Sequence, residues 1–220
     1  INIIYASAKN GIEEVFDFYK TNFQIIPNQI NDSSFESLNV MLGSNRYFED
    51  KSASICWIPE QAYINGSWGF IGGKSFKTNT RYGQLPASEL DILNTTQDPI
   101  FQTQRNGIDE FKADVADGIY EVYFYWAHLI PKVQKEALAY NLGNTSSYEN
   151  AENYVFDVVV NGNTMLQDFD IPNQIGTEQA VIKNTSVSVK EGKGISIKFK
   201  PSTSWTNLTI SPLQLHPKQL

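Results

Sequence analysis

Trp68 lies at the centre of GSWGFIGG (66–73), a stretch rich in glycine. A sugar ring presents C–H groups on one face, and an exposed indole binds that face through dispersion and apolar burial. Glycines around the indole would leave space for such a ligand. Tryptophan is also highly buried on average, and close packing at a strand end would need the same glycines. Two interpretations of Trp68 therefore stay open, a ring displayed for a sugar and a ring packed in the core.

Asp168 and Asp170, in LQDFDIP (166–172), are the best candidates for a catalytic acid and base. Two residues apart on a strand they point the same way, and paired carboxylates cleave glycosidic bonds. Such pairs usually come from separate elements, so a solvated strand end before Pro172 is the favoured interpretation. His128 follows a predicted strand end, where an ordinary surface histidine is expected. We assign no catalytic residue.

The chain contains one cysteine, Cys56, and two histidines, His128 and His216. A single cysteine excludes an internal disulfide, and its apolar surroundings, SASICWIP (52–59), favour a small buried side chain over a nucleophile. Two histidines this far apart do not indicate a zinc site. The sequence has no Gly-x-Ser-x-Gly elbow, P-loop or His-Glu-x-x-His motif. We therefore expect neither a metal nor a cofactor.

The chain has 220 residues, of which 41% are hydrophobic and 19% charged, and its net charge is −7. These proportions are typical of a globular protein with a full core. Nucleic-acid-binding domains usually carry a basic face, whereas Lys and Arg are scattered along this sequence. We expect neither nucleic acid nor an anionic membrane as a partner, and no apolar run reaches membrane-spanning length.

The elements that must position these residues are short strands. Strands are expected at 38–42, 53–58, 68–72, 100–105, 109–115, 119–127, 154–160, 180–189, 195–200 and 208–215. Helical turns are expected only at 86–93 and 133–140. Asn161-Gly162 marks a hairpin turn, since both residues tolerate the backbone that a two-residue turn requires. Short strands at regular spacing predict a β-sandwich or barrel.

Alternation along two strands predicts which side chains face the core. In 119–127 one face carries a charge, so the other is the core face. The predicted core residues of the two strands are Tyr120, Val122, Phe124, Trp126, Phe156, Val158 and Val160.

The first residues of the chain differ from the rest. Asn10-Gly11 predicts a hairpin within 1–23, with a helix over 12–20 as the alternative. Pro, Asn, Asp and Ser then follow in a stretch with the composition of a linker. We place a boundary near Ser37, with 1–36 as the tail of a preceding module plus linker and 37–220 as the main domain.

Several motifs occur in the order found in malectin-like domains, namely SWGFIGGKSF, DPIFQTQRNGIDEFKADVADGIYEVYFYWAH, YVFDVVVNG, QDFDI and GKGISIKFK. The chain most resembles the malectin-like domain at the C-terminus of bacterial family 2 glycoside hydrolases of the β-galactosidase type. The resemblance covers roughly 38–216. It implies an all-β, jelly-roll sandwich with a non-catalytic, carbohydrate-binding role. It also implies that 1–36 belongs partly to an immunoglobulin-like module, and that the parent enzyme works in the bacterial periplasm or outside the cell.

The resemblance also suggests a binding site on loops at one end of the sandwich. In animal malectin, loop aromatics and an aspartate near the C-terminus hold the sugar. Trp68 and Asn106 stand where two of the tyrosines would be, and the aspartate position falls at Thr206. Ile130-Pro131, after His128, replaces a Tyr-Phe pair. The residues proposed to bind the carbohydrate are Trp68, Asn106, His128, Trp205 and Asn207.

Trp68, Asn106, His128 and Trp205 are predicted to converge at one end, because each lies beside a strand end. An oligosaccharide or polysaccharide is the expected partner. Because most of the animal aromatic box is absent, an alternative function remains open. The domain would then have lost sugar binding and would dock structurally against the other domains of its parent hydrolase.

Overall fold

The computed structural model describes residues 30–31, 35–80, 83–85, 87–129, 155–176, 178–202 and 209–218. The hairpin predicted within 1–23 and the helical turn predicted at 133–140 lie outside these residues. Ile30 and Phe35, which precede the predicted boundary at Ser37, are buried in the core. Packing of the sandwich therefore begins before Ser37, and the division into 1–36 and 37–220 stays a prediction.

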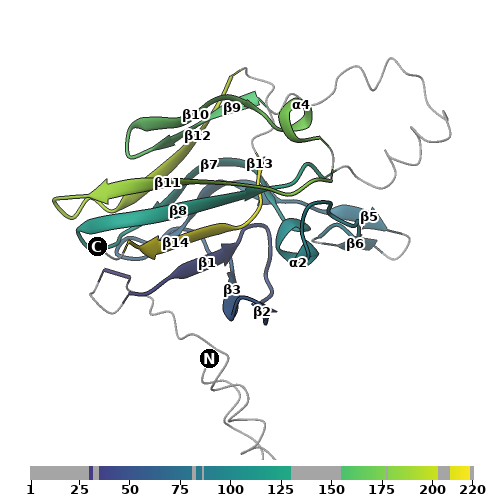
Figure 1. Cartoon of the computed structure of the whole chain (residues 1–220), viewed down its shortest axis with the longest axis horizontal. Coiled ribbons are helices and arrows are strands. Elements are labelled where there is room, and N and C mark those ends of the chain that lie inside the picture. Colours follow the sequence, from purple (N-terminus) through teal and green to yellow (C-terminus); the bar gives the residue numbers. More distant parts are fainter. Residues whose placement is uncertain are drawn as a thin grey trace, which may run out of the picture.

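The first of two packed sheets has six strands among the described residues (Figure 1). Their spatial order is β11 (Val181–Val189), β8 (Gly118–Trp126), β14 (Leu213–Pro217), β1 (Leu38–Met41), β3 (Ile55–Pro59) and β2 (Phe48–Asp50). Neighbours are antiparallel except β1 and β3, which are parallel.

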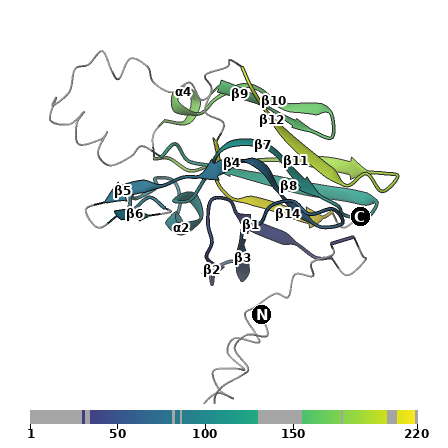
Figure 2. The same cartoon turned by 180° about the vertical axis from the view of Figure 1, so that it is seen from behind.

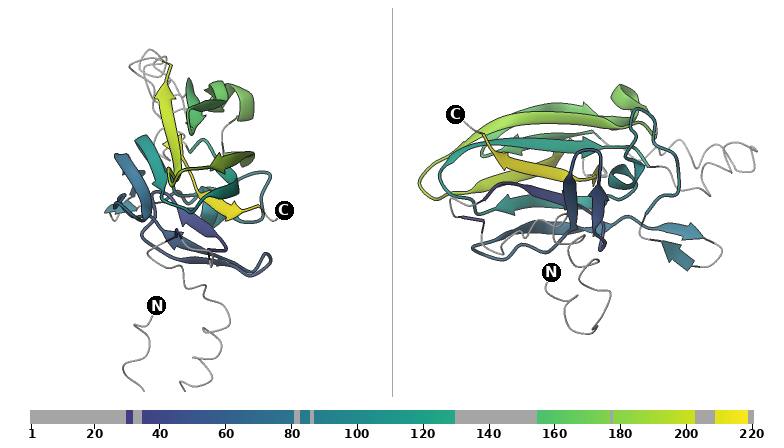
Figure 3. Two further views of the ribbon diagram at one scale, coloured as in Figure 1. Left: turned by 90° about the vertical axis from the view of Figure 1, so that its left-hand side faces the viewer. Right: turned by 60° about the horizontal axis from the view of Figure 1, so that its bottom comes forward.

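The second sheet packs against the first (Figure 3, left). Its order is β10 (Asn163–Asp170), β9 (Val155–Val160), β12 (Ile195–Pro201), β7 (Arg105–Ala113) and β13 (Thr209–Ile210), with β4 (Trp68–Ser75) also paired to β7. A separate hairpin, β5 (Thr78–Thr80) and β6 (Gly83–Leu85), projects from the sandwich (Figure 3, right). The all-β, jelly-roll sandwich expected from the sequence is confirmed.

The core between the sheets is built from the faces that alternation predicts. The predicted core residues of β8 and β9 are all at most 5% exposed. The Asn161-Gly162 hairpin is also confirmed, since Asn163 pairs with Val160 and both turn residues have positive φ, +46° and +83°. The sequence alternation therefore identifies the buried face of each sheet correctly.

A second, smaller hydrophobic cluster covers part of the outer face of the first sheet. Trp57 and Tyr125 meet edge to face with ring centroids 5.2 Å apart, and Phe101 packs on the same tyrosine. Tyr125 is therefore buried although it lies opposite the core face of β8, and burial raises the pKa of its phenol to about 12. Its hydroxyl donates a hydrogen bond to Gln214.

The final predicted strand, 208–215, is divided between the two sheets. β13 ends at Ile210 in the second sheet, and β14 begins at Leu213 in the first. The connection is fixed because Ser211 N–H donates to the Tyr125 carbonyl and the Pro212 carbonyl accepts from Tyr125 N–H. A single continuous strand is therefore wrong, because the chain crosses from sheet to sheet at Ser211-Pro212.

Two further predictions are wrong at the segment before β7. No helix forms over the described residues 87–93, because Leu93 exchanges backbone hydrogen bonds with Glu178 and Ala180. A strand over 100–105 is also wrong, since α2 (Asp98–Phe101) occupies its first half and β7 begins at Arg105. Pro99 suits a first helical turn, where its missing N–H costs no hydrogen bond.

Gly43 allows the turn after β1 to approach the beginning of β7. Its φ is +82°, and a Cβ on it would lie 2.1 Å from the Gln104 carbonyl oxygen. Gly66 has a similar φ of +79°, but a Cβ there would contact nothing within 4 Å. The two glycines therefore share a backbone conformation and differ in their surroundings.

Replacing each glycine by alanine separates these effects. Gly66→Ala should lower the free energy of unfolding by about 1 kcal/mol, the cost of a left-handed backbone. Gly43→Ala should cost several times more, because the neighbouring backbone must move. Urea unfolding of the two variants checks this expectation. Equal losses would show that the turn relaxes freely away from Gln104.

Candidate functional site

The register between β4 and β7 decides where the predicted site residues lie. Trp68 pairs with Ala113, whereas Lys74 pairs with Asn106. Seven residues of strand separate the two pairs, about 20 Å at the usual rise per residue. Trp68 and Asn106 therefore lie at opposite ends of the sandwich, and the predicted convergence of the four residues at one end is wrong.

Trp68 belongs to the core. Its side chain is 4% exposed, and its ring stacks on Phe111 with centroids 6.3 Å apart. A Cβ on Gly69 would lie 2.5 Å from the Tyr63 backbone nitrogen, so this glycine admits a neighbouring chain segment and not a ligand. The expectation of a displayed indole is wrong, and the packed ring is the correct alternative.

Polar contacts close the surface above Trp68. Asp114 accepts hydrogen bonds from the Tyr63 hydroxyl at 2.8 Å and from Gly66 N–H at 2.7 Å. Lys112 donates to the same hydroxyl and lies over the Tyr63 ring, 4.3 Å from its centroid. This hydrogen bond to Tyr63 is the main cause that raises the pKa of Lys112. Loop residues 61–67 are thus held against the end of β7.

The opposite end of the sandwich, called the loop end here, is where Arg105 begins β7 and Thr209 begins β13. Asn106 pairs there with Thr209. His128 follows β8 at the same end, and its carbonyl accepts a hydrogen bond from Glu178 N–H at 2.9 Å. The β5–β6 hairpin and α2 lie at this end (Figures 1 and 2).

Trp205 and Asn207 lie outside the described residues. The segment that contains them, 203–208, leaves β12 after Ser202 and returns at Thr209, which pairs with Asn106. The structure therefore pairs Asn106 with the strand that follows Asn207 and places His128 at the same end of the sandwich, away from Trp68. The positions of the Trp205 and Asn207 side chains stay predictions.

Buried polar oxygens gather where β7 begins. The side-chain oxygens of Thr103, Gln104 and Asn106, and that of Thr78 on β5, are buried without a hydrogen-bond partner among the described residues. Buried polar atoms normally have a partner, so such a group is unusual. Three of the four lie in QTQRN (102–106), which is part of the longest motif that carries the resemblance to malectin-like domains. The loop end thus offers hydrogen-bonding groups at the base of its loops.

Beside this motif, Arg105 forms a buried ion pair that the sequence analysis missed. Its guanidinium donates to both carboxylate oxygens of Glu60, at 2.8 and 2.7 Å, and to the Gly72 carbonyl at 3.1 Å. The same group lies over the Phe70 ring, 3.3 Å from its centroid. No sequence signal could reveal the pair, because its members are 45 residues apart.

Glu60 uses its two oxygens for more than the guanidinium. One accepts a hydrogen bond from Gly43 N–H at 2.7 Å, and the other accepts from the Ser75 hydroxyl at 3.1 Å. The carboxylate therefore joins the turn after β1, the end of β4 and the beginning of β7. These segments form the base of the loop end.

The surroundings of Asp168, Asp170 and the Cys56 thiol indicate structural and not catalytic roles. Asp170 accepts hydrogen bonds from the backbone and side chain of Asn173 at the start of α4 (Ile171–Ile175), and Asp168 is exposed with φ +47°. The solvated strand end is therefore the correct interpretation. Cys56 is buried as predicted, and burial, with a smaller contribution from Glu49, raises the pKa of its thiol.

Within the described part of the chain, no group of three His, Cys, Asp or Glu side chains is placed to bind a metal ion. No helix among these residues is long and apolar enough to cross a membrane.

Comparison with known protein families identifies one match. The family model of the malectin domain matches residues 15–211 of the chain. No curated protein sequence matches it.

Solved structures with the same fold come from enzymes and receptors. The β-glucuronidase of Bacteroides uniformis superposes with a TM-score of 0.71 at 23% identity, over 90% of this chain and 20% of the enzyme. The plant receptor-like kinase FER superposes with a TM-score of 0.57 at 16% sequence identity, over 83% of this chain and 42% of the kinase chain. The ANXUR2 extracellular domain of Arabidopsis thaliana superposes with a TM-score of 0.58 at 15% sequence identity, over 83% of this chain and 41% of the ANXUR2 chain. This chain therefore spans a fifth of the enzyme and about two fifths of the plant proteins.

Trp68→Ala should lower the free energy of unfolding by about 3–5 kcal/mol, because it removes a large ring from the core. Tyr47→Ala removes an aromatic ring that is 56% exposed and should change stability by less than about 0.5 kcal/mol. Denaturant unfolding of both variants measures the difference. If Trp68→Ala were as mild as Tyr47→Ala, the core position of the indole would be wrong.

Arg105→Met should cost about 3–5 kcal/mol, because it leaves the Glu60 carboxylate buried without its cation. Lys193→Ala breaks the Lys193–Glu191 pair, whose side chains are both 75% exposed, and should cost less than about 1 kcal/mol. Adding Glu60→Gln to Arg105→Met should recover part of the loss, as thermal unfolding would measure. A mild effect of Arg105→Met would contradict the importance of the buried pair.

Proposed function

The chain belongs to the malectin domain family, and from this premise we propose that it is a non-catalytic carbohydrate-binding accessory domain of a glycoside hydrolase. The observation that supports the proposal is the loop end, where Asn106 pairs with the strand after Asn207 and where His128 follows β8. Loops on a rigid sandwich commonly carry binding sites. The buried polar oxygens below these loops support the same location.

The residues proposed to bind carbohydrate at the loop end suit an uncharged sugar. The amides of Asn106 and Asn207 can each donate and accept hydrogen bonds, as sugar hydroxyls require. His128 adds an imidazole. With Trp68 in the core, Trp205 supplies the aromatic ring on which the apolar face of the sugar stacks.

We place the domain in a bacterial family 2 hydrolase of the β-galactosidase type that works in the periplasm or outside the cell. The Bacteroides uniformis β-glucuronidase contains a region of the same fold, on which 90% of this chain superposes. This similarity supports a parent of this kind. The other domains of the parent are then its permanent partners.

One observation favours the alternative, a docking module that has lost sugar binding. Trp68 stands where animal malectin has one ring of its aromatic box, and here that ring is packed against Phe111. In this alternative the loop end contacts the catalytic part of the parent. Deleting the domain should then lower the melting temperature of the parent enzyme, whereas the isolated chain binds no glycan.

Trp205→Ala should weaken glycan binding at least about tenfold, because a stacked aromatic ring contributes about 1.5–3 kcal/mol. A glycan array finds the ligand, and isothermal titration compares the wild-type chain, Trp205→Ala and the matched control Tyr47→Ala. The control should bind like the wild type. Equal affinity of all three would remove Trp205 from the site. Absence of any glycan binding, together with a destabilised parent on deletion, would support the docking alternative.

A further inference from the structure

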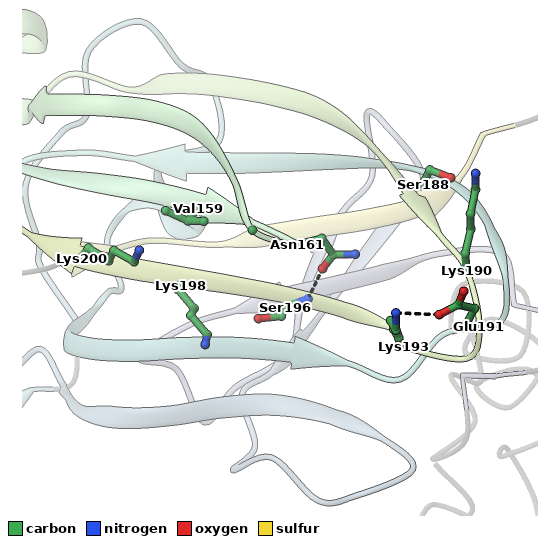
Figure 4. A pocket seen from close by; sticks show the side chains of 10 residues that line it. Val159, Asn161, Ser188, Lys190, Glu191, Lys193, Ser196, Lys198 and Lys200 are labelled. Carbon is green, nitrogen blue, oxygen red and sulfur yellow. Dashed lines mark hydrogen bonds and ion pairs between the residues drawn. The ribbon is translucent and has the colours of Figure 1, made fainter.

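A lysine-lined pocket lies on the outer face of the second sheet, where it extends from the turn between β11 and β12 along β12 (Figure 4). Its volume is about 760 Å³. Lys198 and Lys200 come from β12, on the outer face of the second sheet, because they alternate with the buried Ile197 and Phe199. Lys190 and Lys193 come from the turn between β11 and β12.

Positive charge is concentrated in this pocket although the chain as a whole is acidic. Of the 17 Lys and Arg residues in a chain of net charge −7, four line the pocket, with Glu191 as the single acidic lining residue. Lys193 pairs with Glu191 at 2.6 Å. Lys190, Lys198 and Lys200 have no carboxylate within ion-pair distance among the residues that the structure describes. Three ammonium groups are thus left to solvent.

The nearest carboxylates in the sheet are hydrogen-bonded to other groups. Glu110, which faces Lys198 in the register, accepts from the Ser196 hydroxyl at 2.5 Å. Asp157, which faces Lys200, accepts from Asp168 N–H at 2.8 Å. These charges reduce the local positive potential without forming ion pairs. A ligand with several anionic groups is therefore required, because a single anion would gain little at such an exposed site.

Asn161 fixes the backbone from which the lysines project. Its side chain accepts from Ser196 N–H at 2.7 Å and donates to the Gly194 carbonyl at 3.0 Å, which joins the β9–β10 and β11–β12 turns. Lys198 and Lys200 lie two residues apart on one strand, so both project from the same face about 7 Å apart. Regular spacing of cations on a rigid strand suits a polymer with repeated anionic groups.

From this arrangement we propose that the pocket binds an anionic polysaccharide, whose carboxylate or sulfate groups pair with Lys190, Lys198 and Lys200. The proposed function enters only in the choice of a glycan as the carrier of the charge. No aromatic side chain lines the pocket, so nucleic-acid bases would find no stacking surface. The site lies on the outer face of the second sheet, and its lining residues are different from those proposed at the loop end.

The test compares a charge-removing double variant with a matched control. Lys198→Gln/Lys200→Gln removes two charges from the pocket, and Lys77→Gln/Lys183→Gln removes two exposed charges that do not line it. Binding of each to polygalacturonate, dextran sulfate, neutral dextran and single-stranded oligothymidylate is measured by isothermal titration. The two charged polysaccharides distinguish carboxylate from sulfate recognition.

The wild-type chain should bind at least one charged polysaccharide and not neutral dextran, with affinity that falls as salt is raised. The pocket variant should lose about three- to tenfold in affinity, as expected for two exposed ion pairs, and the control should stay within about twofold of the wild type. Equal affinity of the two double variants would overturn the proposal. So would equally tight binding of oligothymidylate, which would indicate unspecific attraction of polyanions.

Loop-end variants separate this proposal from the proposed function. Trp205→Ala and Asn106→Ala should leave polygalacturonate or dextran sulfate binding unchanged. Loss of that binding in either variant would place the charged ligand at the loop end and overturn the pocket. If the chain binds no neutral glycan, and only the lysine variant weakens binding of the charged polysaccharide, the proposed loop-end site is contradicted and the proposed pocket is supported.

Discussion

The buried ion pair between Arg105 and Glu60 holds together the segments that form the base of the loop end. A guanidinium and a carboxylate are costly to bury, and the cost is offset only when their remaining donors and acceptors are satisfied. Here Glu60 also binds the turn at Gly43 and the hydroxyl of Ser75, while Arg105 also binds the Gly72 carbonyl. The pair therefore fixes the relative positions of β1, β4 and β7. Asn106, the next residue along β7, receives its position from this arrangement.

The two ends of the sandwich have different chemistry although they share strands. At the loop end, uncharged polar side chains with buried oxygens flank Arg105, the first residue of β7. At the opposite end, Asp114 holds the loop over Trp68. The lysines of β12 lie between the two ends, on the outer face of the second sheet. The two proposals therefore assign sugar hydroxyls to the loop end and anionic groups to the outer face of the second sheet.

The strands could be predicted wherever a local pattern decides them. Alternation identified the buried faces of β8 and β9, and Asn161-Gly162 identified a hairpin, because each signal depends on neighbouring residues. The failures lie where distant segments compete. Leu93 pairs with Glu178 and Ala180 and so forms no helix, and the segment over 208–215 divides because Ser211 and Pro212 bond to Tyr125. Tyr125 itself is buried by a second cluster that local alternation cannot reveal.

The sequence by itself determined the fold class, the family and the absence of a catalytic constellation among its motifs, because these depend on residue types and their order. It left Trp68 undecided between a displayed and a packed ring. Only the tertiary structure decided this, since the glycine beside Trp68 makes room for residues 61–63, and this contact is a property of the packed chain. The same holds for the lysine pocket. Its four lysines are close in the sequence, within 190–200, but only the fold places Asn161 and Gly162 of the β9–β10 turn beside them.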